Sequence, residues 1–288
     1  MIAITGASGR LGRLVIATLR QSVPAEEIVA VVRNPRNAED LAAQGIQVRQ
    51  ADYDQPDTLI NALEGADKLL LISSSEIGRR VAQHRAVINA AKHANVGLLA
   101  YTSILHANTS PLPLAAEHQE TESLIQASDI PFVILRNGWY SENYLASVPA
   151  ALQHGVFYGS AGDGRIASAA CADYAEAAAA ALTQAVQPGR IYELAGDEAY
   201  TLAELAHEIS QRAETPVQYQ NLPETEFKSA LVAAGLPEGL ATLLSESDIG
   251  ASKGGLFDDS HQLSQLIGRR TTPVYDQLQS AIQPPSHP

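Results

Sequence analysis

Short apolar runs alternate with amphipathic stretches along the first half of the chain. Such runs, spaced by segments of helical periodicity, are typical of a parallel sheet that is covered on both faces. The pattern predicts strands at Ile2–Thr5, Ile28–Val32, Ile46–Gln50, Lys68–Ile72, Leu98–Thr102 and Phe132–Leu135. It predicts helices between them, including Leu11–Arg20, Asp57–Leu63, Arg79–His93 and Glu117–Ala127. We therefore expect an α/β fold with a doubly wound parallel sheet of the Rossmann type.

The pattern becomes less regular after about Gly138. An alanine-rich helix, Ala169–Leu182, and a strand, Ile191–Ala195, are expected to return to the sheet. Later apolar periodicity predicts short helices and one strand-like segment, at Thr201–Arg212, Glu224–Ala234, Glu238–Leu244, Val274–Ile282 and Val217–Asn221. We expect a Rossmann domain over residues 1–150, with later returns around 165–195, and a smaller, mainly helical domain on the substrate side over 196–288.

Two segments of the second half are rich in loop-forming residues. The glycine-rich stretch Gly250–Ser260 is interpreted as an ordinary surface loop, and a flexible flap is the alternative. The tail, residues 283–288, contains three prolines and is expected to be frayed.

Composition narrows the choice of partners and of compartment. The formal net charge of −13 argues against nucleic acid or an anionic membrane surface as the main partner, because each would repel the protein at long range. The single cysteine, Cys171, excludes an intramolecular disulfide and a thiolate metal cluster. No apolar run has the length of a signal sequence or approaches the ~20 residues of a transmembrane helix. We therefore expect a cytoplasmic protein without membrane insertion; a homodimer is compatible with these data.

A glycine-rich turn follows the first predicted strand. It comprises Gly6, Ala7, Ser8, Gly9, Arg10 and Leu11, with Gly12 after them. Glycines at this spacing between a strand and a helix permit a tight turn and let the backbone approach a pyrophosphate. The N-terminus of the following helix then offers N–H groups and a positive dipole end to the phosphates. The turn therefore predicts a dinucleotide site, and a glycine-rich turn without a ligand is the alternative.

The tip of the second strand carries an arginine, Arg33, with Arg36 close behind it. Enzymes that bind NAD usually place an acidic residue here, on the ribose 2′-hydroxyl. A guanidinium can instead hold a 2′-phosphate through charge-assisted hydrogen bonds. Arg33 therefore favours NADPH, although a solvated surface arginine would give the same sequence.

Polar residues also follow the third and fourth strands. Asp52 and Tyr53 could meet the adenine, and a plain helix cap is an equal rival for the aspartate. Ser73, Ser74 and Ser75 could touch the ribose or simply cap the next helix. We favour cofactor contact for the serines, because the carboxyl ends of parallel strands line one crevice.

The sixth strand leads into an aromatic and polar run. Asn137, Gly138, Trp139, Tyr140, Ser141, Glu142, Asn143 and Tyr144 follow one another, and Trp139 is the only tryptophan of the chain. Aromatic walls with a few polar groups suit a flat, neutral substrate beside a nicotinamide. Trp139, Tyr140 and Asn143 are therefore candidate catalytic residues; the alternative is that Trp139 packs between the domains.

A helix in the middle of the chain lacks a familiar catalytic pair. Short-chain dehydrogenases of the common type carry Tyr-x-x-x-Lys there, and this chain has His118 and Glu122 at the equivalent spacing. Residues four apart share one helix face, so His118 is a candidate proton donor. A histidine that faces the cleft or solvent without a catalytic role is the competing interpretation.

Together these motifs resemble those of NmrA-like atypical short-chain dehydrogenases. The quinone oxidoreductases of this family carry segments similar to TGASGRLG, VVRNP, LRNGWYSENY, YELAGD and ASKGGLFDDS. Triphenylmethane-dye reductases are related members. The resemblance implies NADPH at Gly6–Leu11, Arg33, Ser73–Ser75 and Asn137–Glu142, with a quinone stacked near the nicotinamide. The chain departs from the family at Cys171, where relatives commonly place an arginine before the Ala-Asp pair. A small buried residue is the favoured interpretation of Cys171, and a redox role is the rival.

The missing Tyr-Lys pair fits quinone reduction. A ketone accepts hydride to become a strongly basic alkoxide and needs an acid, whereas a reduced quinone is a stable, phenolate-like anion. We therefore expect direct hydride transfer from NADPH to a quinone, without flavin or metal. The alternatives are a non-catalytic NADP(H) redox sensor of the NmrA type and a triphenylmethane-dye reductase.

Overall fold

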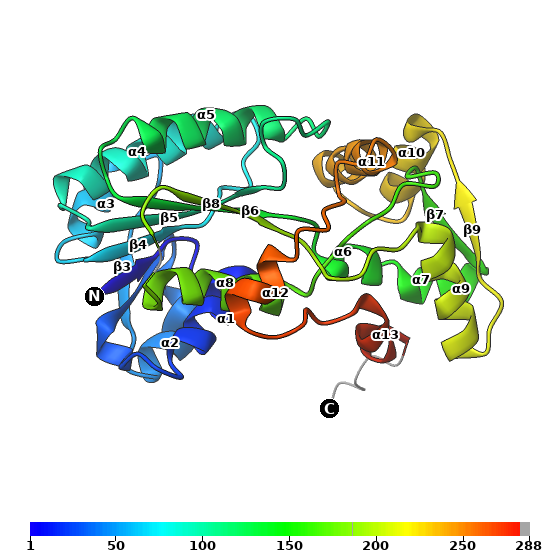
Figure 1. The fold of residues 1–288 in the computed structure, drawn as a ribbon, viewed down its shortest axis with the longest axis horizontal. Helices are drawn as coiled ribbons and strands as arrows, with labels where there is room; N and C mark the ends of the chain where they lie inside the picture. Colours follow the sequence, from blue (N-terminus) through cyan, green and yellow to red (C-terminus); the bar gives the residue numbers. More distant parts are fainter. Residues whose placement is uncertain (186, 283–288) are drawn as a thin grey trace. The chain divides into compact units, whose positions relative to one another are not determined.

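The computed structural model describes residues 1–185 and 187–282 (Figure 1). Contacts within the chain separate two compact units. The first comprises Met1–Asn108, Leu114–Asn137 and Cys171–Leu194, and the second comprises Thr109–Pro113, Gly138–Ala170 and Ala195–Pro288. The first unit is therefore discontinuous in sequence. The domain limits expected from the sequence, 1–150 and 196–288, stay a prediction.

The first unit is built on a seven-stranded sheet in the order β3-β2-β1-β4-β5-β6-β8, with every neighbouring pair parallel. Strands such as Ile28–Val32 are buried at every residue, which is why they appear in the sequence as uninterrupted apolar runs. The predicted doubly wound sheet is confirmed. Its strands are β1 (Ile2–Ile4), β2 (Ile28–Val32), β3 (Gln47–Gln50), β4 (Lys68–Leu71), β5 (Leu98–Ile104), β6 (Phe132–Asn137) and β8 (Arg190–Leu194).

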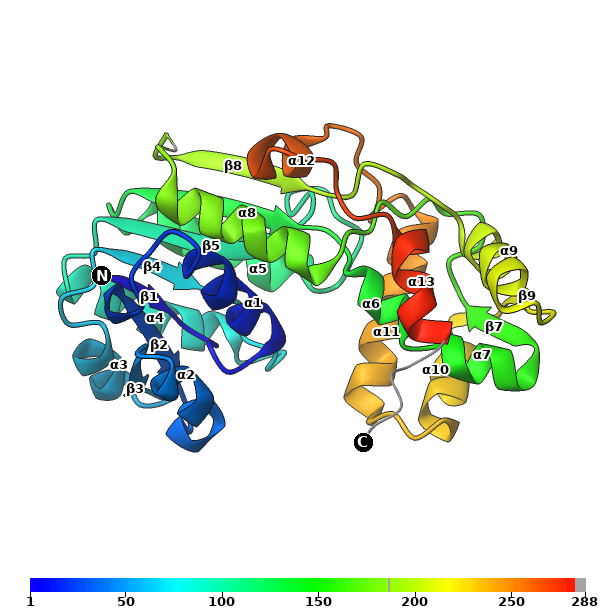
Figure 2. The ribbon, with the colours of Figure 1, turned by 90° about the horizontal axis from the view of Figure 1, so that it is seen from below.

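Helices cover both faces of this sheet. Helices α3, α4 and α5 lie on one face, and α1 and α8 lie side by side on the other (Figures 1 and 2). Helix α8 is rich in alanine, so its backbone can pack closely against α1. The helices of this unit are α1 (Arg10–Leu19), η1 (Ala25–Glu27), η2 (Pro35–Ala38), α2 (Glu39–Ala43), α3 (Pro56–Ala62), α4 (Arg80–His93), α5 (Ala115–Gln126) and α8 (Cys171–Thr183).

A buried ion-pair network joins β5, β6, β8 and α5. Arg136 of β6 donates to both carboxylate oxygens of Glu122, at 2.9 and 2.6 Å, and to Glu193 at 2.8 Å. Ser103 of β5 donates to the same Glu122. The carboxylates raise the pKa of Arg136, so the guanidinium stays charged although it is only 5% exposed. Strands β5 and β6 therefore continue beyond the ends predicted from their apolar runs, because the polar side chains of Ser103 and Arg136 form hydrogen bonds inside the unit.

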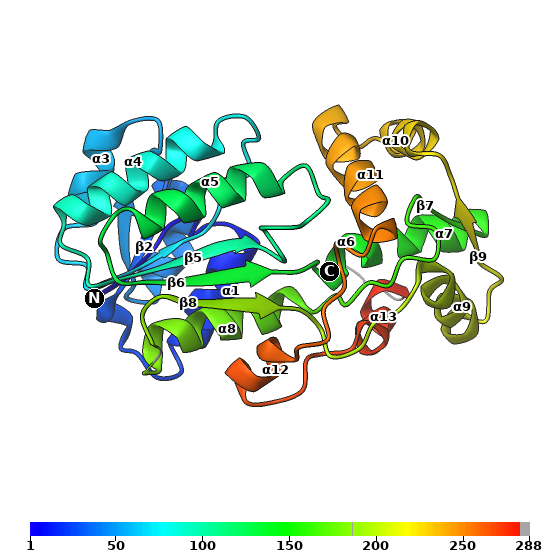
Figure 3. The ribbon, with the colours of Figure 1, turned by 45° about the horizontal axis from the view of Figure 1, so that its top comes forward.

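The second unit is mainly helical, as predicted, and contains a two-stranded parallel sheet (Figure 3). The strand-like segment Val217–Asn221 forms one strand of this sheet, while its partner was not predicted. The elements are α6 (Ser141–Leu145), α7 (Val148–His154), β7 (Val156–Gly159), α9 (Leu202–Ala213), β9 (Gln218–Asn221), α10 (Glu224–Ala233), α11 (Glu238–Ser252), α12 (Gln262–Ile267) and α13 (Val274–Ile282).

The candidate flap at Gly250–Ser260 is packed. Its first residues extend α11 to Ser252, and Leu256 is 1% exposed. The Leu256 carbonyl accepts a hydrogen bond from the Ala167 N–H at 2.8 Å. A Cβ atom at Gly255 would lie 2.6 Å from the Leu112 side chain, so this glycine serves close packing. This packing gives no support to the alternative of a flexible flap. The proline-rich tail lies outside the described residues.

No helix among residues 1–185 and 187–282 combines the length and the apolar character that crossing a membrane requires.

A carboxylate is buried in the second unit. Asp248 of α11 is 2% exposed and accepts hydrogen bonds from the Tyr144 hydroxyl at 2.9 Å and the Ser160 N–H at 2.8 Å. Burial raises its pKa to about 6, and the two hydrogen bonds oppose that rise. The folded state therefore holds this proton more tightly than the unfolded chain does.

This predicts a pH-dependent cost of ionising Asp248. Well below pH 4 the residue is protonated in both states, so burial carries no ionisation penalty. Between about pH 4 and pH 6 the unfolded chain ionises while the folded chain keeps this proton, so stability falls, by up to about 3 kcal/mol once the pH has passed 6. Unfolding in urea at pH 4.5 and pH 7.5 should show the larger part of this fall in the unmodified chain and a smaller fall in Asp248→Asn. Asp163→Asn, at an exposed site of the same unit, is the matched control. Equal pH dependence in all three proteins would contradict the prediction.

Candidate functional site

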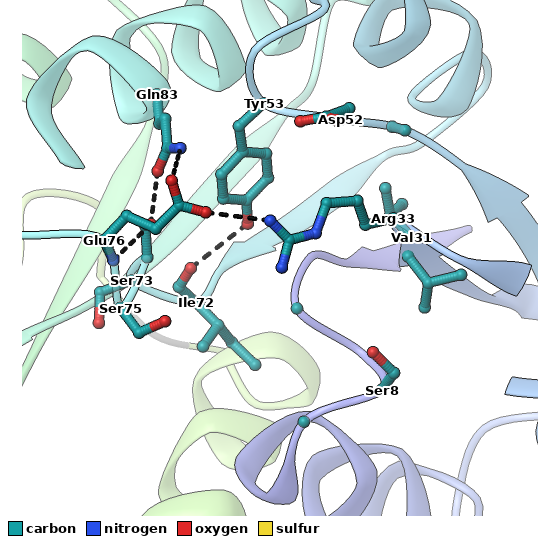
Figure 4. Close-up of a pocket in the computed structure, with 15 residues that line it drawn as sticks. Ser8, Val31, Arg33, Asp52, Tyr53, Ile72, Ser73, Ser75, Glu76 and Gln83 are labelled. Carbon is teal, nitrogen blue, oxygen red and sulfur yellow. Dashed lines mark hydrogen bonds and ion pairs between the residues drawn. The ribbon is translucent and has the colours of Figure 1, made fainter. Parts of the chain in front are cut away.

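A cavity of about 310 Å³ opens at the carboxyl ends of β1, β2, β3 and β4 (Figure 4). Parallel strands present these ends at one sheet edge, and β1 and β4 are neighbours although α1, β2, α2, β3 and α3 separate them in sequence. All lining residues belong to the first unit. They are Gly6, Ser8, Gly9, Val31, Val32, Arg33, Ala51, Asp52, Tyr53, Ile72, Ser73, Ser74, Ser75, Glu76 and Gln83.

The glycine-rich turn forms one wall of the cavity. Gly6 has a φ of +61°, a backbone conformation that residues with a side chain rarely adopt. A Cβ atom at Gly12 would lie 2.6 Å from the Gly6 carbonyl oxygen and 2.7 Å from the Ala7 Cα, so α1 approaches the turn as only glycine allows. Gly6, Ser8 and Gly9 line the cavity, whereas Ala7 and Leu11 are buried outside its lining and Arg10 is exposed.

The N-terminus of α1 is suited to an anion. Its N-cap is Gly9, which offers no side-chain cap, and its first turn contains no acidic residue. A ten-residue helix that begins in this way presents its positive dipole end without a competing carboxylate. The Ser8 carbonyl accepts a hydrogen bond from Arg13 at 3.1 Å, which ties the turn back to α1.

Arg33 stands where β2 opens into the cavity. Its side chain is 71% exposed, and its Nη1 lies 3.0 Å from Glu76 Oε1. A guanidinium at this point is available to an anionic ligand in solvent. Arg36, by contrast, lies outside the lining, in the short helix η2.

The serines and Tyr53 are held by hydrogen bonds from behind. Ser73 donates its N–H to Thr102 Oγ1 at 2.9 Å, and Ser74 donates its N–H to His84 Nε2 at the same distance. The Tyr53 hydroxyl donates to the Ile72 carbonyl at 3.4 Å. The predicted residues Asp52, Tyr53 and Ser73–Ser75 are thus brought together with the glycine turn.

Three contributors were not anticipated from the sequence. Glu76 and Gln83 line the cavity, and His84 supports it from behind. Thr121 Oγ1 donates to the Glu117 carbonyl, so it accepts from His84 Nδ1, which leaves Nε2 free to accept from Ser74. Burial, with a smaller effect of Arg80, lowers the pKa of His84 to about 3. His84 is therefore a neutral positioning residue for the Ser74 backbone.

The predicted proton donor, His118, is also buried, at 5% exposure. Its Nδ1 lies 2.7 Å from the Tyr101 hydroxyl, and burial lowers its pKa well below the usual value. His118 faces neither solvent nor the described cavity. Its helix neighbour Glu122 is bound to Arg136, so the two residues do not form a Tyr-Lys-like pair. This placement gives no support to acid catalysis by His118.

Asn137 ends β6 with an unsatisfied acceptor. The side chain is 6% exposed, and its Oδ1 has no hydrogen-bond partner among the residues that the structure describes. A buried amide oxygen in this state can accept a hydrogen bond from a ligand. It stands on the last residue of a strand, at the same sheet edge as the cavity.

The aromatic run after β6 belongs to the second unit, apart from Asn137. Trp139 is buried, and its ring lies 6.4 Å from that of Tyr144. Backbone hydrogen bonds join Trp139 and Ser141 to Ala169 at 3.1 and 2.9 Å. Gly138, Tyr140, Glu142 and Asn143 are half-buried, while Ser141 is buried and pairs with Ser168. The run is a fixed part of its unit.

One further expectation concerns the single cysteine. Cys171 begins α8 at 1% exposure, as expected of a small buried residue. Within the described ranges, no three His, Cys, Asp or Glu side chains form a group that could hold a metal ion.

Comparison with known proteins places the chain among nucleotide-dependent reductases. Residues 6–184 match a family described as NAD(P)H-binding. Quinone oxidoreductase 2 of Escherichia coli is 61% identical over 96% of this chain and 97% of its own length. The crystal structure of the E. coli NADPH-dependent quinone oxidoreductase with NADPH has a TM-score of 0.94, at 60% identity over 97% of this chain and 99% of the other. The triphenylmethane reductase of Citrobacter, solved with NADP(H), also has a TM-score of 0.94, at 37% identity, covering 98% and 100% of the two chains.

The geometry of the turn predicts the effect of a side chain at Gly9. A Cβ atom there already lies 3.2 Å from the Gly6 carbonyl oxygen, and the branches of a valine would extend along the cavity wall. Gly9→Val should abolish dinucleotide binding, measured by fluorescence titration, while the circular dichroism spectrum is unchanged. Gly239→Val is the control, because a Cβ at Gly239 meets nothing within 4 Å. Unaltered affinity in a folded Gly9→Val protein would mean that the phosphates bind elsewhere.

Proposed function

The chain belongs to the NAD(P)H-binding, NmrA-like family of reductases, and on this basis we propose that it is an NADPH-dependent oxidoreductase that transfers hydride directly to a quinone. The observation that carries the proposal is the cavity at the sheet edge, where the glycine turn and Arg33 lie in one lining. The full-length similarity to a quinone oxidoreductase supplies the class of substrate.

The residues present fit NADPH. We assign the pyrophosphate to Gly6–Leu11 at the N-terminus of α1, because that end combines close backbone approach with a favourable dipole. Arg33 would hold the 2′-phosphate, and Ser73–Ser75 would meet the ribose. The free Oδ1 of Asn137 suits the carboxamide of the nicotinamide, and the stretch up to Glu142 would complete that end.

We assign the quinone to the aromatic run. Trp139, Tyr140 and Asn143 offer flat apolar surface and an amide, which suit a planar ring with two carbonyl oxygens. Their backbone is fixed by Ala169, so they can orient a substrate without rearranging.

Quinone reduction requires little acid catalysis from the protein. NADPH supplies a hydride, and the quinone takes up that hydride and one proton to become a hydroquinone. Because the reduced quinone is a weak base, water can deliver the proton. The buried, neutral His118 agrees with this requirement. The protein contributes orientation and exclusion of water.

Two other functions remain as outcomes of the test. The similarity to a triphenylmethane reductase favours dye reduction as a second activity of the same site. A non-catalytic NADP(H) sensor would bind the nucleotide without turnover. We further propose a cytoplasmic location, which suits a chain with one cysteine and a reduced cofactor; a homodimer stays a prediction.

The assignment of Arg33 predicts a change of cofactor preference. Arg33→Asp removes the contact to the 2′-phosphate and adds a carboxylate that repels it but accepts from a free 2′-hydroxyl. The ratio of the NADPH and NADH dissociation constants should shift toward NADH by roughly tenfold or more. An unchanged ratio would remove Arg33 from the cofactor site.

The proposed activity predicts that purified protein without flavin absorbance oxidises NADPH when a simple benzoquinone is added. Trp139→Ala should reduce kcat substantially, because stacking sets the geometry of hydride transfer. His118→Ala should slow turnover only modestly, and a loss of about 10²–10⁴-fold would instead indicate an essential acid.

Two results would count against quinone reduction. Tight NADPH binding with no oxidation by any quinone or dye would favour the sensor. Efficient ketone reduction with little quinone activity would require an acid outside the residues assigned above.

A further inference from the structure

Arg33 faces a carboxylate across the mouth of the cavity. Its Nη1 donates to Glu76 Oε1 at 3.0 Å, from the tip of β2 to the segment between β4 and α4 (Figure 4). Both residues line the cavity. The cation assigned to the 2′-phosphate is therefore already paired with an anion of the chain itself.

Glu76 is held in place from the side opposite Arg33. Its Oε2 accepts from Gln83 Nε2 at 3.0 Å and lies 3.5 Å from Arg79 Nη1. Its N–H donates to Ser74 Oγ at 3.1 Å. Gln83 is 3% exposed, so the group that orients the carboxylate is itself fixed. These contacts keep Glu76 pointed at Arg33 without help from Arg33.

A 2′-phosphate would meet this carboxylate at the guanidinium. Both groups are strong acceptors for the same N–H donors, and their negative charges repel each other at short range. NADH carries a neutral hydroxyl at that position, so it brings no competing charge. A carboxylate at this point can even accept a hydrogen bond from a ribose hydroxyl.

We propose that Glu76 is a specificity-determining residue that competes with the 2′-phosphate for Arg33. It weakens NADPH binding more than NADH binding, and so it limits the preference that Arg33 creates. The inference rests on the proposed function in one respect, the assignment of Arg33 to the 2′-phosphate; it does not depend on the quinone.

The test is equilibrium binding of NADPH and of NADH to the purified full chain, followed by nucleotide fluorescence. Glu76→Gln keeps the size of the side chain and removes its charge. It should tighten NADPH binding by roughly two- to fivefold, the range set by loss of an exposed ion pair. NADH binding should change by less than about twofold or weaken. The gain should shrink in about 1 M NaCl, where the screening length falls to about 3 Å.

Two further proteins separate competition from a general charge effect. Glu120→Gln makes the same chemical change at an exposed residue of α5 that pairs with Arg85, and it should leave both affinities unchanged. In an Arg33→Gln background, Glu76→Gln should give a much smaller gain for NADPH, because the contested cation is absent.

Each remaining outcome overturns the inference. An unchanged ratio of affinities in Glu76→Gln would show that Arg33 holds both anions without conflict. An equal gain with and without Arg33 would show general repulsion in place of competition. If the unmodified chain failed to bind NADPH, the proposed function would fall as well, so failure of the two ideas can be told apart.

Discussion

The close approach of α1 to the turn after β1 is the constraint on which the site depends. With a Cβ at Gly12 only 2.6 Å from the Gly6 carbonyl, no other residue fits without moving backbone. The helix therefore begins directly at the sheet edge, and its N-cap residue, Gly9, forms part of the cavity wall. The parallel arrangement then adds the tips of β2, β3 and β4 to the same wall. Backbone atoms supply the anion-binding surface, while side chains supply selectivity.

Ionisable side chains have different roles inside the first unit and at the cavity. Inside the unit, Arg136, His84 and His118 are buried and form hydrogen bonds to other side chains or to backbone. At the cavity, Arg33 is 71% exposed and shares its charge with Glu76. In a chain with a net charge of −13, this local pair is part of the charge that an anionic cofactor meets at the cavity. One set of ionisable side chains thus stabilises the fold, and another is available to bind a ligand.

The sheet and the glycine turn could be predicted because their signals are local: uninterrupted apolar runs and three closely spaced glycines. The ends of β5 and β6 were underestimated, since Ser103 and Arg136 look polar in sequence and are buried by partners far along the chain. Strand β7 is short and partly exposed, so it has little periodicity of its own. Glu76 and Gln83 were missed because their role depends on which loop faces Arg33. The glycines of 250–260 suggested flexibility, yet at Gly255 the missing side chain makes room for Leu112.

The discontinuity of the first unit has a consequence for biosynthesis. Strand β8 and helix α8 lie in Cys171–Leu194, after an intervening stretch that belongs to the second unit. While the chain is being translated, β6 therefore keeps an open edge, and α1 keeps its apolar face uncovered, until that late segment leaves the ribosome. An unpaired edge and exposed apolar surface are the features that promote aggregation of partly folded chains. Completion of the nucleotide-binding sheet thus requires that Gly138–Ala170 of the second unit be synthesised first, so the first unit cannot be complete before part of the second has been made.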